Sequence, residues 1–433
     1  MEKTENKAVS FITLGCKVNQ YETNAMIQQF VQNGYTIVDT EDKSQICIVN
    51  TCTVTNMSDR KSRQMLRKFK QKNPNSIIVA VGCYAQVAKT ELEKMEEIDL
   101  VLGNNEKKDI VKYVEKYIKE NEIFNQVTDV MHQKEFVDFG SITYTDRNRA
   151  VVKIQDGCDR FCSYCIIPYA RGRVRSRQPQ SIIEEIEKLA QNGEKEIIIT
   201  GIHIASYGKD FKNRISLIDL LENIDNIKGI ERIRLGSLEP TLITDEFIER
   251  LSKLNHICHH FHLSLQSGSN DTLKRMNRKY TTEEFEEIVN RIRNKYDNAI
   301  LTTDIIVGFP GETEKEFTDT YNFLKKIAFY KMHVFPYSPR KGTKAAEMPE
   351  QIDGNTKEKR SKKLIELSNE KQLEYNEKYI GKEIQVLWEE REGEYLKGHS
   401  ENYILVKYKT MENLENTLST VTIKKADTEF IEA

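Results

Sequence analysis

Three closely spaced cysteines are the residues of this sequence best suited to chemistry. Cys158, Cys162 and Cys165 have three residues between the first two and two residues between the last two. This spacing places three thiolates on one tight loop. Three thiolates hold three irons of a 4Fe–4S cube and leave the fourth iron open, unlike the four-cysteine clusters of electron carriers. The loop is therefore expected to carry a cluster that binds a ligand and does chemistry.

A zinc site is the alternative for this loop. Structural zinc normally has four protein ligands, often from paired CxxC elements, and the loop supplies only three. Cys258 or His203 could add a fourth ligand from a distance, so zinc stays open on the motif alone. The His-rich run around Cys258 is not expected to share a metal, because side chains alternate between the faces of a strand: His256, His259, His260 and His262.

A second set of cysteines lies near the N-terminus. Cys16, Cys52 and Cys83 each follow an apolar run that is typical of a buried strand. The carboxyl ends of strands in an open parallel sheet line one crevice, so residues far apart in sequence meet there. We therefore expect these thiols to converge and to hold a second cluster with an open iron. Cys47 and Cys258 are predicted to pack as small buried residues.

The segments that carry these residues alternate between apolar runs and helical patterns, which predicts an α/β protein with parallel strands. The first strands are expected at Ala8–Leu14, Ile46–Asn50, Ile77–Val81 and Ile98–Leu102. A second series is expected at Ala150–Gln155, Glu196–Thr200, Arg232–Leu235, Phe261–Leu265, Leu301–Val307 and Met332–Phe335. Six strand–helix units predict a partial (βα)6 TIM-like barrel with its chemistry at the carboxyl ends of the strands.

The predicted elements divide the chain into domains. The N-terminal parallel α/β domain is expected at 7–119, a polar linker at 120–143 and the barrel at 144–374. After a Lys-rich helix, short alternating stretches within 377–433 predict a small β-barrel.

The loop after the first barrel strand resembles that of the radical S-adenosylmethionine (SAM) superfamily. The resemblance implies that the methionine part of SAM chelates the open iron, and that cleavage of SAM gives a 5′-deoxyadenosyl radical that abstracts hydrogen from the substrate. Stretches at other strand ends extend the likeness, although each of their residues also fits an ordinary turn or barrel packing. The residues expected to bind SAM are Tyr164, Gly201, Ser264, Gln266 and Asp304.

With the N-terminal cysteines included, the whole chain resembles the methylthiotransferases, which have an N-terminal cluster domain, a radical SAM core and a C-terminal TRAM domain. Gly15–Thr23, Cys165–Gly172 and Gly201–Gly208 resemble the MtaB-type branch, which modifies N6-threonylcarbamoyladenosine at tRNA position 37. The resemblance implies two 4Fe–4S clusters and two equivalents of SAM, one for the methyl group and one for the radical. The acceptor is C2 of adenine, an unactivated carbon without an acid–base route.

Other functions remain open. Relatives methylthiolate isopentenyladenosine in tRNA or an aspartate of a ribosomal protein. A non-catalytic iron–sulfur or zinc RNA-binding protein would share the cysteines and basic patches, but it would not need six barrel units with glycines at their strand ends. The partners expected are tRNA, an electron donor of the flavodoxin or ferredoxin type, and a sulfur donor that the sequence does not identify.

Basic clusters are the candidate RNA contacts. Arg171, Arg173, Arg175 and Arg177 follow the cysteine loop and are expected to bind phosphates at the mouth of the site. The basic stretch Arg60–Lys72 is more typical of a solvated helix face. The C-terminal module has eight Lys or Arg against twelve Asp or Glu, so its RNA binding would depend on selected side chains: Lys397, His399, Tyr403, Lys424 and Lys425.

Composition sets limits on these interpretations. The chain has 433 residues, and this length predicts two or three domains. Its 65 Lys and Arg nearly balance 67 Asp and Glu, so RNA must be met by local patches rather than by net charge. The polar N-terminus and the short first apolar run predict a cytoplasmic protein without a membrane segment.

Overall fold

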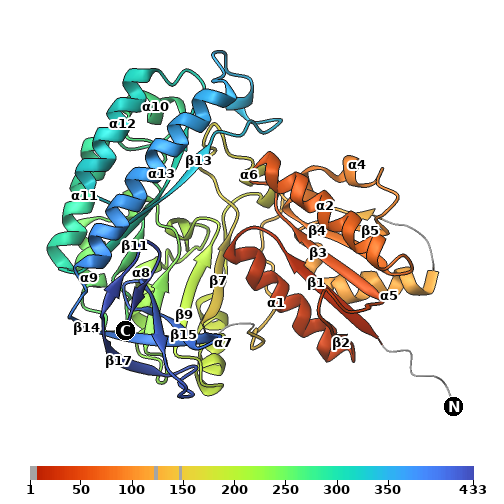
Figure 1. Cartoon of the computed structure of the whole chain (residues 1–433). Helices are drawn as coiled ribbons and strands as arrows, with labels where there is room; N and C mark the ends of the chain where they lie inside the picture. Colours follow the sequence, from red (N-terminus) through yellow and green to blue (C-terminus); the bar gives the residue numbers. More distant parts are fainter. Residues whose placement is uncertain (1–6, 121–124, 146–148) are drawn as a thin grey trace.

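The computed structural model describes residues 7–120, 125–145 and 149–433. Figure 1 shows three parts in chain order: an N-terminal sheet between helices, a larger set of strands backed by helices, and a curled C-terminal sheet. The predicted α/β class with this three-part architecture is confirmed. Within the described ranges, no helix is both long and apolar enough to cross a membrane.

The N-terminal part is an open parallel sheet with the strand order β2-β1-β3-β4-β5-β6. Its strands are β1 (Ala8–Thr13), β2 (Thr36–Ile37), β3 (Ile46–Thr51), β4 (Ile77–Gly82), β5 (Leu100–Leu102) and β6 (Asn125–Gln126). The helices are α1 (Lys17–Gln32), α2 (Asn56–Lys72), α3 (Cys83–Val87), α4 (Lys89–Leu92) and α5 (Ile110–Glu120). Helices cover both faces, which explains why the central strands are continuous apolar runs.

The central part has six parallel strands, as predicted. They are β7 (Ala150–Asp156), β9 (Glu196–Gly201), β10 (Arg232–Leu235), β11 (His260–His262), β12 (Ile300–Val307) and β13 (Lys331–Pro336). Parallel bridges from Ile233 to Ile257 and from Leu238 to Leu263 connect β10 with β11. No described strand pairs β13 with β7, so the barrel is open on that side. A short strand, β8 (Arg175–Ser176), runs antiparallel to β7 and was not predicted.

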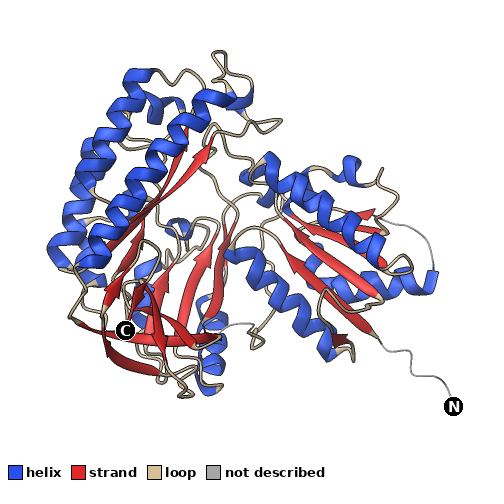
Figure 2. Ribbon diagram, viewed as in Figure 1, coloured by secondary structure: helices blue, strands red, loops and turns tan. Residues whose placement is uncertain are grey.

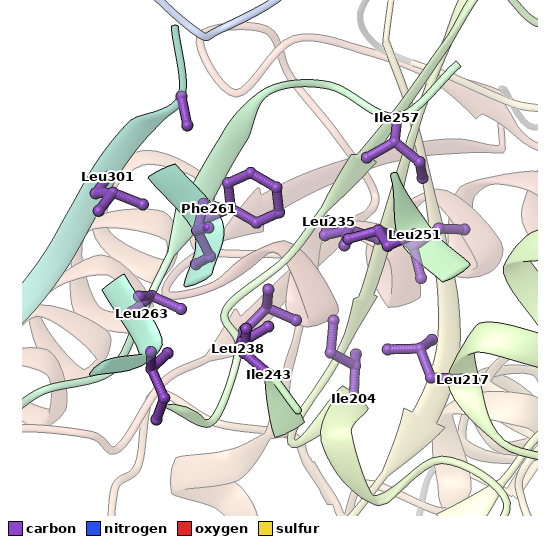
Figure 3. Close-up of a cluster of buried hydrophobic side chains, with 14 of the residues drawn as sticks. Ile204, Leu217, Leu235, Leu238, Ile243, Leu251, Ile257, Phe261, Leu263 and Leu301 are labelled. Atoms are coloured by element: carbon purple, nitrogen blue, oxygen red, sulfur yellow. The ribbon is translucent and has the colours of Figure 1, made fainter. Parts of the chain in front are cut away.

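Helices cover the outside of the open barrel (Figure 2). They are α7 (Pro179–Gln191), α8 (Leu217–Ile224), α9 (Asp245–Leu251), α10 (Asn270–Arg275), α11 (Thr282–Lys295) and α12 (Glu314–Ile327). Figure 3 shows part of the core between the two layers, where Leu235 lies beside Leu251 and Leu238 lies beside Ile243. The packed core holds the strand ends, and the loops that follow them, in fixed positions.

The C-terminal part begins with α13 (Gly354–Glu377), which packs along β13. A curled sheet follows with the order β17-β14-β15-β16-β19-β18. Its strands are β14 (Glu383–Glu392), β15 (Tyr395–Ser400), β16 (Leu405–Lys409), β17 (Leu418–Thr422), β18 (Lys425–Ala426) and β19 (Ile431–Glu432). Trp388 is fully buried in a core that also contains Ile300 and Tyr330 of the barrel, so this part is packed against the barrel.

The segment predicted as a polar linker packs on its neighbours where it is described; residues 121–124 lie outside the described residues. Val130 and Ile142 are buried. Ile142 joins a small cluster with Tyr21 of α1, and Asp138 pairs with Arg177. These contacts connect the N-terminal part with the barrel.

Candidate active site

The first cysteine set lies on the loop between β7 and α6 (Ile167–Arg171). The N–H of Cys158 donates to the carbonyl of Gly172 at 3.0 Å, and the N–H of Cys165 donates to that of Cys162 at 2.9 Å. The backbone N–H of Arg160 donates to the Sγ of Cys158 at 3.4 Å. All three cysteines line a cavity of about 1060 Å³ at the carboxyl end of the strands. The three cysteines of this loop therefore line one shared cavity.

The five residues predicted to bind SAM line this same cavity: Tyr164, Gly201, Ser264, Gln266 and Asp304. A Cβ on Gly201 would lie 3.0 Å from the carbonyl oxygen of Gln155, so a side chain there would crowd the backbone. Gln266 has a φ of +74° and donates its N–H to the carbonyl of Asp304 at 2.9 Å. The structure brings the predicted residues together; their contact with SAM stays a prediction.

Two further residues that were not predicted from the sequence, Arg278 and Glu239, also line this cavity. Arg278 donates to Glu239 Oε2 at 2.8 Å, to the carbonyl of Ser264 at 2.9 Å and to the Sγ of Cys162 at 3.4 Å. It therefore connects the cysteine loop with two other strand ends. Neither residue belongs to a local sequence motif. Glu239 follows β10 and Arg278 follows β11 and α10, so their contact depends on how these elements pack together.

The second cysteine set also meets at strand ends. Cys16 follows β1, Cys52 follows β3, and Cys83 follows β4 directly as the first residue of α3. Gly15 has a φ of +100°, and a Cβ there would lie only 2.8 Å from the Sγ of Cys52. Burial, and then the neighbouring thiol of Cys83, raise the pKa of Cys52 to about 11. The thiols thus lie close together; their role as iron ligands stays a prediction.

Arg171 lies between the two cysteine sets and is fully buried. Its Nε donates to the Sγ of Cys83 at 3.1 Å, and its Nη2 donates to Asn19 at 2.6 Å and to Glu22 at 2.9 Å. Its Nη1 lies 3.3 Å from Asp156, two residues before the first cysteine of the loop. One guanidinium therefore connects the N-terminal sheet with the cysteine loop.

The buried ion-paired group around Arg171 carries more positive than negative charge. Lys107, Lys153, Arg171 and Arg175 are its cations, and Glu22 and Asp156 are its carboxylates. Buried charge must be compensated. Thiolates at the neighbouring cysteines would supply the missing negative charge, and iron ligation requires thiolates. The donor set and its surroundings therefore fit an iron–sulfur cluster.

The expectation that the arginine loop binds phosphates is wrong for three of its four residues. Arg171, Arg175 and Arg177 are buried, and Arg177 pairs with Glu185 at 3.0 Å. Because β8 runs back along β7, Arg175 and the adjacent Arg177 turn inward, whereas Arg171 at the end of α6 is held by Cys83 and Glu22. Only Arg173 is exposed, with its guanidinium 4.7 Å from the ring centroid of Phe161.

Some of the other residues considered as RNA contacts are paired with carboxylates or face the cavity, and others are exposed. Several residues of α2 are paired with neighbouring carboxylates, as a solvated helix face would be. In the C-terminal part, Lys397 pairs with Glu392 and His399 with Glu389. Tyr403 faces the cavity rather than the outer surface. Lys424 and Lys425 are exposed.

The described residues contain no group of three or more His, Cys, Asp or Glu that could hold a single metal ion. The ligands of a cubane bind separate irons and lie farther apart than the ligands of one ion. The histidines of the His-rich run have different partners: His256 contacts Asp225, and His259 contacts Asn298. Cys258 and Cys47 are buried, as predicted.

Comparisons with known proteins identify the family. Residues 152–324 match the Radical SAM superfamily, and residues 8–103 match the Uncharacterized protein family UPF0004. "Threonylcarbamoyladenosine tRNA methylthiotransferase MtaB" of Bacillus subtilis is 42% identical over 96% of this chain and 94% of its own. The protein of the same name from Aquifex aeolicus is 43% identical over 92% and 96%. A "tRNA-2-methylthio-N(6)-dimethylallyladenosine synthase" of Clostridium botulinum is 36% identical over 87% and 85%.

Solved structures agree at the level of the fold. The radical S-adenosylmethionine methyltransferase TsrM from Kitasatospora setae has a TM-score of 0.56 at 16% identity, over 76% of this chain and 72% of its own. Radical SAM enzymes use SAM together with a 4Fe–4S cluster. Because relatives above 40% identity cover nearly the whole chain, and the cysteine loop follows the first barrel strand, the chain belongs to the radical SAM methylthiotransferase family.

Proposed function

We propose that this enzyme transfers a methylthio group to C2 of N6-threonylcarbamoyladenosine at position 37 of tRNA. The observation that carries the proposal is that Cys16 lines the same cavity as Cys158, Cys162 and Cys165, so both cysteine sets have access to one substrate. The Bacillus and Aquifex relatives are named for this modified base, which supports the choice of substrate.

Each cysteine set is suited to hold one 4Fe–4S cluster with an open iron, which makes two clusters. The ligands would be Cys158, Cys162 and Cys165 for one cluster and Cys16, Cys52 and Cys83 for the other. When bound, the clusters supply reductive cleavage of SAM and the site of sulfur transfer, and two equivalents of SAM are used. The chain itself positions SAM along the cavity wall and keeps water away from reactive species.

Further partners follow from this function. The electron donor would be of the flavodoxin or ferredoxin type, and the reaction needs a sulfur donor. We assign 377–433 as a TRAM domain that binds RNA, with the exposed Arg173, Lys424 and Lys425 as contacts to phosphate. The domain limits 7–119 and 144–374, and a cytoplasmic location, belong to the same proposal.

The test is a reconstituted assay on three tRNAs that differ only at position 37. They carry threonylcarbamoyladenosine, isopentenyladenosine or adenosine, and the products are measured by mass spectrometry of nucleosides. We expect the 2-methylthio product from the first tRNA only, because a site built for a polar substituent rejects substrates that leave its groups unpaired. Equal turnover of the isopentenylated tRNA would contradict the proposed choice of substrate but would leave the family assignment intact.

A further inference from the structure

The positive charges that line the cavity differ in whether they already have partners. Arg278 is bound to Glu239 and to the sulfur of Cys162. Arg160 donates to the hydroxyl of Thr241 at 3.2 Å and lies 4.0 Å from Glu239. The guanidinium of Arg278 is therefore committed to the surroundings of the cysteine loop, and Arg160 lies beside Cys158 of that loop rather than beside Cys16.

Lys17 is different. It is the first residue of α1, directly after Cys16, and it lines the cavity. In the described part of the chain its ammonium has neither a hydrogen bond nor an ion pair, and its recorded contact is with the ring of Tyr403, whose centroid is 5.8 Å away. Lys331 also lines the cavity and has no ion pair among the described residues, but it is the first residue of β13 and so lies at the amino end of that strand, away from the cysteine loop.

The other cations around Tyr403 have counter-ions of their own. Arg149 pairs with Glu389 at 2.9 Å, and Arg234 pairs with Glu196 at 2.7 Å. Among the residues that the structure describes, Lys17 is therefore the cation of this wall that has no paired carboxylate. Because a partly desolvated charge is stabilised by an opposite charge, this wall is suited to an anionic group of a ligand.

His260 adds a second free polar atom to the same wall. It is 6% exposed, lines the cavity, and stacks on Tyr403 with 4.7 Å between ring centroids. Its Nε2 lies 3.0 Å from the hydroxyl of Thr302, whereas its Nδ1 is buried and has no hydrogen-bond partner within the described ranges. If Nε2 accepts the hydroxyl proton of Thr302, then Nδ1 carries the hydrogen and can donate it to a ligand.

We propose that Lys17, together with Nδ1 of His260, binds the free carboxylate of the threonylcarbamoyl group on the target adenine. This inference rests on the function proposed above. C2 and C6 of adenine are both bonded to N1, so the N6 substituent leaves the ring close to the carbon that receives sulfur. The side chain next to Cys16 is therefore well placed to meet it. A dimethylallyl group has no charge and would leave Lys17 without a counter-ion.

The test is a binding measurement with holoenzyme and two tRNAs that differ only in the threonyl carboxylate and its carboxamide. Lys17→Met should weaken binding of the carboxylate tRNA by about 10- to 100-fold, because a hydrogen-bonded charge pair is lost. Binding of the carboxamide tRNA should change by about threefold or less. Lys17→Arg should retain most of the preference for the carboxylate. Lys112→Met, an exposed lysine of α5, is the matched control and should behave as wild type.

The outcomes separate this inference from the proposed function. If wild-type enzyme methylthiolates the carboxylate tRNA but Lys17→Met weakens both tRNAs equally, or neither, the inference is overturned and the function stands. If wild-type enzyme does not modify the carboxylate tRNA at all, the function itself fails. Iron and sulfide content, measured in each variant, shows whether the clusters are intact.

Discussion

At the scale of single residues, Arg171 shows how burial changes the role of a charge. In sequence it belongs to a row of arginines that is typical of phosphate binding. In the structure it donates to Cys83, Asn19 and Glu22 and has no exposure to solvent. Its function is therefore to hold the two cysteine sets in a fixed relation rather than to contact RNA.

Replacing Arg171 by Met should strongly destabilise the protein. The change takes buried hydrogen bonds away from Asn19 and Glu22, and each buried polar group that loses its donor typically costs about 1–3 kcal/mol. The free energy of unfolding, measured by urea titration of the protein without clusters, checks this value.

The matched control is Arg173→Met in the same loop. Arg173 is exposed and lies 3.4 Å from Asp159, and surface ion pairs contribute only about 0–1 kcal/mol. If Arg173→Met lowered the free energy of unfolding as much as Arg171→Met does, the loop rather than the buried network would determine the stability.

At the scale of elements, the strand ends explain why the cysteines meet. The strands that precede Cys16, Cys52 and Cys83 were predicted to within two residues, because buried parallel strands are uninterrupted apolar runs. The short strand β8 was not predictable, because its pairing depends on a sharp return of the chain. Gly157 permits that return: a Cβ there would lie 1.8 Å from the carbonyl oxygen of Arg173.

The two cysteine sets should be separable by mutation. Cys83→Ala should spare cleavage of SAM but stop sulfur insertion, and its iron content should fall from about eight to about four per chain, since each cubane holds four irons. Deoxyadenosine release, iron analysis and nucleoside mass spectrometry measure the three effects.

Cys47→Ala is the matched control for this prediction. Cys47 lies on β3, the strand that leads to Cys52, but it is buried beside Ser10 and Ser44. This variant should keep both clusters and full activity. Retention of eight irons and full methylthiolation in Cys83→Ala would show that the second cluster has other ligands.

At the scale of the whole molecule, all three parts of the chain line one cavity. Lys17 comes from the N-terminal part, Arg278 from the barrel and Tyr403 from the C-terminal part. The cysteines were predicted from their spacing and their places at strand ends, which are local signals, and five other cavity residues were predicted from the resemblance to the radical SAM superfamily. It did not predict Arg278 or the place of Tyr403, because these positions depend on how the parts pack together.

The junction between the barrel and the C-terminal part is built around Glu196. Its carboxylate accepts hydrogen bonds from Arg234, which also donates to the carbonyl of Glu401 at 2.9 Å. Arg232 donates to the carbonyl of His399 at 2.9 Å. The carboxylate of Glu196 thus orients guanidiniums that bind the backbone of the C-terminal part.

This junction should weaken in acid. Burial opposes ionisation of Glu196, but Arg234, Arg149 and Arg232 hold its pKa at about 2, below the usual 4.5. The contribution of Glu196 to the free energy of unfolding is therefore present above pH 4.5 and is lost as the pH falls toward 2. The difference between the two pKa values corresponds to about 3 kcal/mol.

Trp388, the single tryptophan, lies in the C-terminal core, so its fluorescence reports the unfolding of this part at each pH. Glu196→Gln should flatten the fall in the free energy of unfolding between pH 4.5 and 2, whereas Glu366→Gln, an exposed side chain of α13, should not. Identical profiles for the two variants would place the acid sensitivity elsewhere.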